Sequence, residues 1–152
     1  MQQYNILFFL FLFSLFLFSQ DNDEISNAIE ILCDTPIEST TIGYGSDQEQ
    51  LITWGLNDCG TPVDTSPGVW YYLEGNDLDL FLRMCDSSYD TKLHVFQDDG
   101  FNLSCVTGND DGYVCESSYL HSAVSFYAAS GYTYYIYVSG YALDEGDFML
   151  NL

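Results

Sequence analysis

Residues 89–112 read YDTKLHVFQDDGFNLSCVTGNDDG, and the rest of the chain can be interpreted outward from this stretch. The runs 89–96 and 103–107 are rich in β-branched and aromatic residues, and the turn QDDG at 97–100 lies between them. An Asp-Gly turn between two such runs is typical of a β-hairpin, because glycine supplies the positive φ that tight hairpin turns need. The stretch therefore predicts two antiparallel strands.

The open end of this hairpin is acidic. With the turn centred within QDDG, antiparallel pairing sets Asp90 opposite Asn109. The carboxylates of the turn itself, Asp98 and Asp99, lie about 25 Å away at about 3.4 Å per residue, so they cannot share a site with the open end. The residues predicted to converge at that end, here called the acidic tip, are Asp90, Asn109, Asp110 and Asp111.

The acidic tip is a candidate calcium site. Hard cations such as Ca²⁺ prefer several carboxylate and carbonyl oxygens, which this tip offers. Its spacing does not match the EF-hand loop. The alternative is that Asp90 and Asn109 only cap loop amides, as Asp and Asn at strand ends commonly do.

Apolar residues alternate with other residues along most of the remaining chain. The alternation recurs at 69–73, 78–84, 124–126, 134–138 and 148–152. A period of two is typical of half-buried strands. Together with Gly and Asp turns and no long helical pattern, it predicts an all-β fold, an antiparallel β-sandwich or jelly roll of about eight strands supported by disulfides.

The N-terminal part of this domain is less regular. Residues 26–33 fit either a short helix or a strand, and residues 38–45 predict a second short strand. Residues 46–67 are polar and contain two prolines, so we predict a partly ordered loop that covers the sandwich. Its apolar residues, which could plug into the domain, are Leu51, Ile52, Trp54 and Leu56.

An ordered set of motifs resembles the bacterial pre-peptidase C-terminal domain and its cysteine-containing secreted relatives. The set comprises Asp-Thr at 90–91, Asn-Asp-Asp at 109–111, SAVSFY at 122–127, SGYTYYIYVSGY at 130–141 and GDFMLNL at 146–152. The resemblance covers about residues 68–152 and favours a strand within 26–33. It implies a compact β-sandwich that accompanies secreted or surface proteins, and some relatives bind calcium, collagen or polysaccharide.

The N-terminus carries an apolar run at residues 6–18, interrupted only by Ser14. This run is shorter than the about 20 residues that a membrane-spanning helix needs. We therefore predict a signal peptide over 1–19, cleaved after Ser19, and a secreted or cell-surface domain over 20–152. The alternative is an uncleaved segment that anchors the chain to a membrane.

Five cysteines in a small exported chain indicate disulfides and an oxidising compartment. Cys85 precedes the acidic tip and Cys115 follows it, so these two can reach each other. A bridge between Cys33 and Cys59 would then tie the first strand to the covering loop and leave Cys105 unpaired. Spacing alone leaves other pairings open.

The net charge of −21, with only Arg83 and Lys92 as cations, limits the partners. Nucleic acid is excluded, because binding phosphate requires clustered Lys and Arg. Anionic membrane surfaces are disfavoured for the same reason. Self-repulsion of this size predicts a domain that works where cations screen it, or simply an acidic surface that keeps the protein soluble.

Aromatic side chains form a second candidate site, for polysaccharide or a partner protein. Two strands carry aromatic residues that share a face, and either row could stack against sugar rings. The alternative is that these rings fill the edges of the core while their polar atoms reach water. The candidate contacts are Trp54, Trp70, Tyr72, Tyr135, Tyr137 and Tyr141.

Catalysis finds little support in the sequence, and we predict no catalytic residues. His94 alternates out of phase with Leu93 and Val95, which predicts a solvent-facing or edge position. His121 and Ser122 are adjacent, but the chain has no nucleophile elbow and no oxyanion glycines. Neither the spacing of zinc ligands nor a phosphate loop is present.

Asn102-Leu103-Ser104 is an acceptor for N-glycosylation if the chain passes through a eukaryotic secretory pathway. Asn102 lies just beyond the hairpin turn, where a glycan would be exposed. A mass shift on glycosidase treatment tests this prediction.

Three functions are compatible with these features. The first is a secreted, monomeric, non-catalytic module that binds extracellular matrix, surface polysaccharide or a partner protein, with calcium at the acidic tip. The second is a structural acidic surface protein without a specific small ligand. The third is a hydrolase or a hydrolase inhibitor.

Overall fold

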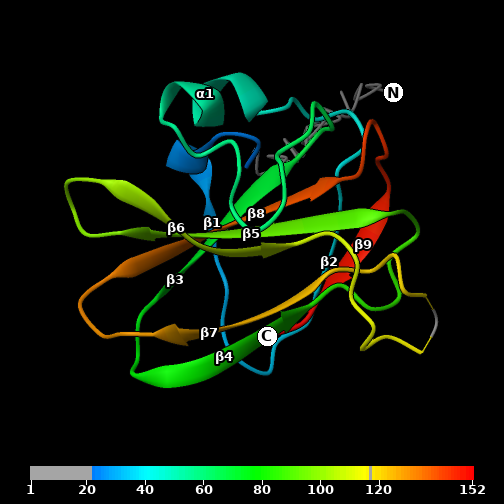
Figure 1. Cartoon of the computed structure of the whole chain (residues 1–152). Helices are drawn as coiled ribbons and strands as arrows, with labels where there is room; N and C mark the ends of the chain where they lie inside the picture. Colours follow the sequence, from blue (N-terminus) through cyan, green and yellow to red (C-terminus); the bar gives the residue numbers. More distant parts are fainter. Residues whose placement is uncertain (1–21, 117) are drawn as a thin grey trace, which may run out of the picture.

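The computed structural model describes residues 22–116 and 118–152 (Figure 1). The predicted signal peptide, residues 1–19, and its cleavage site lie outside the described residues. Within the described ranges, no helix is long and apolar enough to cross a membrane.

The larger layer of the molecule is a five-stranded sheet with the spatial order β1-β3-β8-β5-β6. β1 pairs with β3 in parallel, and the other pairs in this sheet are antiparallel. β8 is the central strand and β5 lies beside it; these two are the longest strands, with eight residues each. The bounds are β1 (Ile29–Glu30), β3 (Val69–Glu74), β5 (Thr91–Asp98), β6 (Leu103–Asn109) and β8 (Thr133–Gly140).

The second layer consists of two antiparallel pairs. β2 (Ile37–Thr40) pairs with β9 (Asp147–Leu150), and β4 (Leu78–Arg83) pairs with β7 (Ala123–Ala128). An isolated bridge between Arg83 and Asn151 joins the two pairs. The two layers face each other in Figure 1. The predicted all-β sandwich is confirmed; the described part of the chain has nine strands, and β1 with β3 is its one parallel pair in an otherwise antiparallel arrangement.

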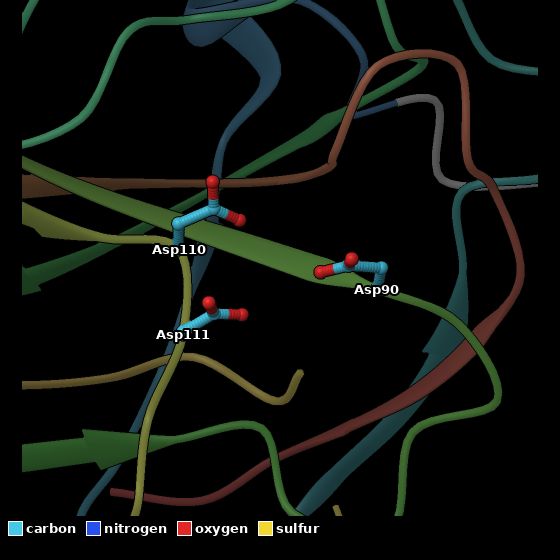
Figure 2. Close-up of side chains that lie close together, drawn as sticks. All are labelled: Asp90, Asp110 and Asp111. Atoms are coloured by element: carbon cyan, nitrogen blue, oxygen red, sulfur yellow. The ribbon is translucent and has the colours of Figure 1, made fainter. Parts of the chain in front are cut away.

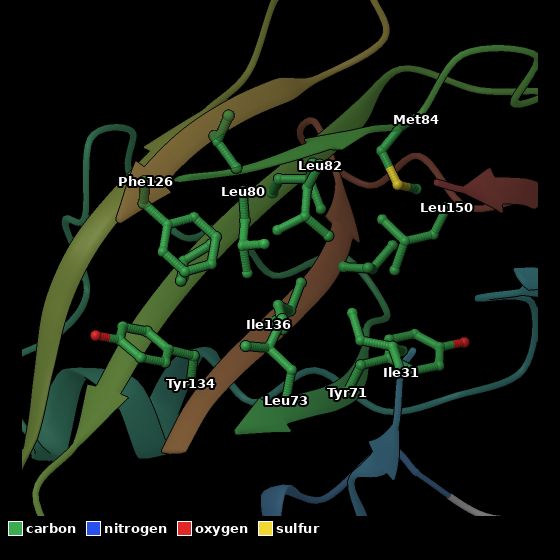
Figure 3. Close-up of a cluster of buried hydrophobic side chains, with 14 of the residues drawn as sticks. Ile31, Tyr71, Leu73, Leu80, Leu82, Met84, Phe126, Tyr134, Ile136 and Leu150 are labelled. Carbon is green, nitrogen blue, oxygen red and sulfur yellow. The ribbon is translucent and has the colours of Figure 1, made fainter. Parts of the chain in front are cut away.

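The main core lies between the two layers. Side chains from β4, β7 and β9 point toward side chains from β3 and β8 in Figure 3. The alternation seen in the sequence places Leu80 and Leu82 inward on β4, whereas Phe81 between them is exposed. Burying each such leucine stabilises the fold by about 1.5–3 kcal/mol. The largest fully buried members of this core are Tyr71, Leu82, Met84, Leu93, Tyr134, Ile136 and Leu150.

A second apolar cluster lies on the other face of the five-stranded sheet, beneath residues 46–67, here called the covering segment. This segment contains the short helix α1 (Gln48–Thr53), which buries Leu51 completely. Beneath it, Trp70 donates its indole N–H to Asp47 Oδ2 at 2.6 Å. Tyr137 accepts a hydrogen bond from the Asp47 amide at 3.2 Å. The prediction of a partly ordered covering loop therefore holds, and it explains why β3 and β8 are buried on both faces.

The covering segment also overturns the predicted exposure of His94. His94 is on the face opposite Leu93, as its alternation requires, but this face is covered rather than solvated. The ring is 0% exposed. Its Nε2 donates to the Thr61 carbonyl at 3.1 Å, and it stacks on Phe96. Burial lowers the pKa of His94 to about 4.

The hairpin of residues 89–112 forms, but its register differs from the prediction. Asp98 pairs with Leu103, and Leu93 rather than Asp90 lies opposite Asn109. The loop is centred later than QDDG suggested, and a β-bulge after Val95 adds a further residue to β6. A bulge leaves one residue of a strand unpaired and shifts every pair beyond it.

Two N-terminal elements match the patterns in part. Residues 26–33 contain both alternatives in succession, because the 3₁₀ helix η1 (Ile25–Asn27) precedes β1 (Ile29–Glu30). The strand predicted at 38–45 is β2 (Ile37–Thr40), which ends earlier.

Two disulfides link distant parts of the chain. Cys85–Cys115 forms as predicted. The predicted Cys33–Cys59 bridge is wrong, because Cys59 bonds Cys105 and Cys33 is a free, exposed thiol. The reason is the path of the covering segment, which carries Cys59 across the sheet to β6 instead of toward the first strand. Two disulfides indicate an oxidising compartment.

Candidate functional site

Three carboxylates of the acidic tip come together in the folded chain. One oxygen each of Asp90, Asp110 and Asp111 lies within 4.8 Å of the other two. Figure 2 shows the Asp90 carboxylate directed toward the segment that carries Asp110 and Asp111. The three carboxylates lie together even though the register differs from the prediction. Asp90 immediately precedes β5, and Asp110 and Asp111 immediately follow its neighbour β6. We call these three residues the acidic cluster.

Hydrogen bonds made by Ser122 position the segment before β5 and the segment after β6, which carry the cluster. Ser122 donates its amide N–H to Thr91 Oγ1 at 2.8 Å. Its hydroxyl lies close to the Thr91 carbonyl and donates to the Asp110 carbonyl at 2.7 Å. Gly112 allows the close approach, because a Cβ there would overlap the backbone of His121 and Ala123. These hydrogen bonds join the start of β5 and the end of β6 to the segment that leads into β7.

Burial and mutual repulsion act on these carboxylates. Burial, followed by the charges of Asp110 and Asp111, raises the pKa of Asp90 to about 6. Burial also raises the pKa of Asp110, although the ammonium of Lys92 counteracts this shift. Asp90 Oδ1 and Asp110 Oδ1 are both buried, and neither has a hydrogen-bond partner in the described part of the chain. An unpartnered buried carboxylate oxygen is costly unless a cation or a proton compensates it.

Lys92 supplies one cation beside the cluster, and the sequence reasoning missed this. Lys92 is only 2% exposed. Its Nζ lies 2.7 Å from Asp64 Oδ2, 3.0 Å from the Pro62 carbonyl and 3.5 Å from Asp110 Oδ2. It also lies 5.1 Å from the ring centroid of Tyr141. One signal was available: Lys92 follows Asp90 by two residues, so the strand period puts both on the same face.

Asn109, predicted as a fourth ligand, has a different contact. Its Oδ1 accepts a hydrogen bond from the Ala123 amide at 3.1 Å. This is the capping role that the alternative interpretation assigned to it. Asp99 plays the same part at the opposite end of the hairpin, where its Oδ1 accepts from the amides of Phe101 and Asn102.

The aromatic candidates separate into four groups. Trp70 and Tyr137 are each 0% exposed beneath the covering segment, so the prediction that they contact a ligand is wrong. Tyr141 is exposed, but it lies beside Lys92 near the acidic tip. Tyr72 is half-buried and its ring packs against Tyr135 at a centroid distance of 6.3 Å.

Trp54 and Tyr135 remain as accessible candidates, and they line a common groove. The groove has a volume of about 490 Å³. Phe101, which sequence reasoning missed, also lines it, as does the glycosylation candidate Asn102. Phe101 follows Gly100 in the hairpin turn, so an unusually apolar turn residue was the available signal.

The geometry thus contains two distinct candidate sites, an oxygen-rich cluster that suits a hard cation and an aromatic groove at the other end of the β5–β6 hairpin. Comparison of the chain with models of protein families, with curated proteins and with solved structures finds no match.

Proposed function

We propose that this chain is a secreted, non-catalytic binding module whose acidic cluster holds a calcium ion. The observation that carries this proposal is the pair of buried carboxylate oxygens, Asp90 Oδ1 and Asp110 Oδ1, that lack hydrogen-bond partners within the described residues. They belong to the acidic cluster, in which one oxygen of each carboxylate lies within 4.8 Å of an oxygen of each of the other two. A divalent cation would compensate both orphaned oxygens at once.

Calcium fits this cluster better than magnesium does. Ca²⁺ accepts about six to eight oxygen ligands in flexible geometry, whereas Mg²⁺ demands a tight octahedron. Asp111 is exposed, so water can complete the ligand set from that side. A bound ion would tie the segment before β5 to the segment after β6, and so stabilise the tip of the sandwich.

The setting of the module is argued from the disulfides and the charge. Cys59–Cys105 and Cys85–Cys115 support an oxidising, extracellular environment. A net charge of −21 suits surroundings that are rich in screening cations. The partner we propose is an extracellular polysaccharide or protein. Kinship with the pre-peptidase C-terminal domain stays a prediction.

A non-catalytic role is favoured by the placement of the imidazoles. His94 and His121 are the only histidines of the chain, and both are buried. Neither ring is therefore presented to a substrate. Hydrolysis of a generic ester or glycoside by the purified protein would contradict this part of the proposal.

The decisive experiment is thermal unfolding of the oxidised protein in EDTA and in millimolar calcium at fixed ionic strength. Calcium should raise the unfolding temperature saturably, following the logarithm of free calcium over its dissociation constant. Asp90→Asn combined with Asp111→Asn should abolish the response. Asp79→Asn is the matched control, because Asp79 is an exposed carboxylate on β4.

An alternative function is a structural acidic protein, and the position of Lys92 favours it. The Lys92 ammonium already neutralises part of the charge at the tip. No calcium response, or equal responses to calcium, magnesium and sodium, would support this alternative and contradict the calcium site.

A further inference from the structure

The aromatic groove brings together side chains from three separate segments. Trp54 immediately follows α1, Phe101 lies in the β5–β6 turn and Tyr135 belongs to β8. Its volume of about 490 Å³ falls within the about 300–1,000 Å³ usual for ligand sites. The polar residues Asp98 and Asn102 also line it.

The exposed rings have no evident role in the core. Phe101 is 92% exposed and Trp54 is 43% exposed. A phenylalanine left in water forgoes the stabilisation that burial of its ring would give. The turn nevertheless holds Phe101 in place, because Asp99 Oδ1 accepts from the Phe101 amide at 2.8 Å. The turn presents an apolar ring to solvent on a fixed backbone.

The walls of the groove are held relative to one another. The Cys59–Cys105 disulfide joins the covering segment, which carries Trp54, to β6. The ring of Tyr135 packs edge-on against the buried Trp70 at a centroid distance of 6.5 Å. Fixing the binding groups before a ligand arrives lowers the entropy cost of binding.

The charges around the groove select against acidic ligands. Its lining contains Asp98 and no Lys or Arg. Both cations of the chain are elsewhere, since Lys92 is buried beside the acidic tip and Arg83 ends β4. Uronic and sulfated saccharides would therefore be repelled, as would nucleic acid. A purely cationic peptide would need only charge, which this acidic surface offers everywhere, and would not need the aromatic rings.

We propose that the groove binds an uncharged hexopyranose chain, and this inference rests on the binding-module function proposed above and names its ligand class. The C–H face of a pyranose ring stacks on an aromatic face, whose electrons attract the C–H groups. Trp54 and Phe101 provide the stacking faces. Asp98 Oδ1 holds the Gly100 amide, and the carboxylate keeps further capacity to accept sugar hydroxyls.

The test is titration of the full oxidised chain with a β-1,4-linked glucose hexamer, followed by calorimetry and tryptophan fluorescence. Trp54 is the only exposed tryptophan, because Trp70 is fully buried, so a change of emission reports on the groove. Protein made without N-glycosylation is used, since a glycan on Asn102 would occupy the groove. Polygalacturonate serves as the anionic comparison, and a lysine-rich peptide serves as the cationic one.

We expect the hexamer to bind and polygalacturonate not to bind. Trp54→Ala and Phe101→Ala should each weaken binding about tenfold or more, as loss of an aromatic anchor does. Phe81→Ala, which removes an exposed ring from the outer face of β4, should leave affinity unchanged. Absence of hexamer binding, indifference to both groove substitutions, or binding of the lysine-rich peptide that both substitutions weaken would each overturn the inference.

Running the titration with EDTA and with calcium separates the two proposals. Hexamer binding without any calcium effect on unfolding would retain the groove and reject the cation site. Calcium stabilisation without hexamer binding would retain the cation site and reject the groove.

Discussion

Lys92 Nζ lies 2.7 Å from Asp64 Oδ2, and this ion pair joins the covering segment to β5. The lysine is almost completely buried, whereas the side chain of Asp64 is 27% exposed. The amide of Ala142 donates to the same Asp64 oxygen at 3.0 Å, so the pair also anchors the loop after β8. One of the two cations in this strongly acidic chain thus connects three segments.

Replacing Lys92 with methionine should destabilise the fold. Lys92→Met keeps the apolar stem but leaves Asp64 and Asp110 without their cation, which should lower the free energy of unfolding by about 3–5 kcal/mol. Urea denaturation measures the loss. Arg83→Met is the matched control, because it removes the same charge from an exposed residue and should cost less than about 0.5 kcal/mol. Equal losses in both variants would show that net charge, not the buried pair, matters.

The same variant should respond more strongly to calcium if the ion binds the acidic cluster. Lys92 competes with a metal for the charge of Asp110, since its Nζ lies 3.5 Å from Asp110 Oδ2. The rise in unfolding temperature between EDTA and calcium should therefore be larger in Lys92→Met than in the unaltered protein. A smaller rise would place the calcium elsewhere.

Loss of the Cys59–Cys105 disulfide should loosen the covering segment. The bridge spans 46 residues of sequence, and closing a loop of this size stabilises a fold by about 2–4 kcal/mol. Cys59→Ser combined with Cys105→Ser should lower the unfolding temperature and make Trp70 accessible to a fluorescence quencher. Cys85→Ser combined with Cys115→Ser should leave Trp70 protected in the folded state.

The count of free thiols checks the pairing behind this prediction. The unreduced native protein should react with one equivalent of iodoacetamide, at Cys33, as mass spectrometry of its peptides would reveal. Alkylation at Cys105 instead would contradict the Cys59–Cys105 bridge.

His94 should make the fold less stable in mild acid. The pKa of His94 is about 4 in the folded protein and 6.5 without its environment. Between these values the unfolded chain binds a proton that the folded chain does not bind. Above about pH 6.5 His94 is neutral in both states and does not weaken the fold. As the pH falls from there toward about 4, the free energy of unfolding decreases by up to about 3 kcal/mol, because only the unfolded chain gains the proton.

His94→Phe isolates this contribution. Lys92, Asp64 and Asp58 act on the ring electrostatically, and other carboxylates titrate in the same range, so the difference between the two proteins is the quantity to measure. Urea denaturation from pH 4 to pH 8 should give a difference that changes over the predicted window. A difference independent of pH would show that His94 stays neutral in the unfolded chain or charged in the folded one.

Gly108 is needed for the covering segment to reach β6. A Cβ on Gly108 would overlap the carbonyl group of Cys59. Gly108→Ala should therefore cost about 1–3 kcal/mol, because backbone must move to admit the methyl group. Gly45→Ala is a suitable control, since the nearest atom to its Cβ would be Asp23 Oδ2 at 3.7 Å. Similar stabilities of the two variants in urea would contradict the close approach.

The strands and the acidic cluster could be predicted because each depends on residues that are near one another in the sequence. Alternation identifies the residues that share a face, so Leu80 and Leu82 were assignable without a structure. Asp90, Asp110 and Asp111 flank two strands joined by a short loop, so they converge even though the register was wrong. A register error of a few residues leaves these three carboxylates close together, but it changes which residue lies opposite Asn109.

The residues whose exposure or bond partner was predicted wrongly depend on contacts between distant segments. Alternation put His94, Trp70 and Tyr137 on one face of the sheet, but whether that face meets water is decided by residues 46–67. The same segment carries Cys59 to Cys105 and Asp64 to Lys92. No local pattern records the path of a long polar segment.

By itself, the sequence determined an all-β, disulfide-supported chain with a large negative charge and an acidic end to its central hairpin. The tertiary structure alone decided which sheet face is covered, which cysteines pair and which of the two cations, Lys92, is buried. The physical reason is that side-chain period and charge are properties of neighbouring residues, whereas burial and bond partners depend on packing between segments that only the folded chain brings together.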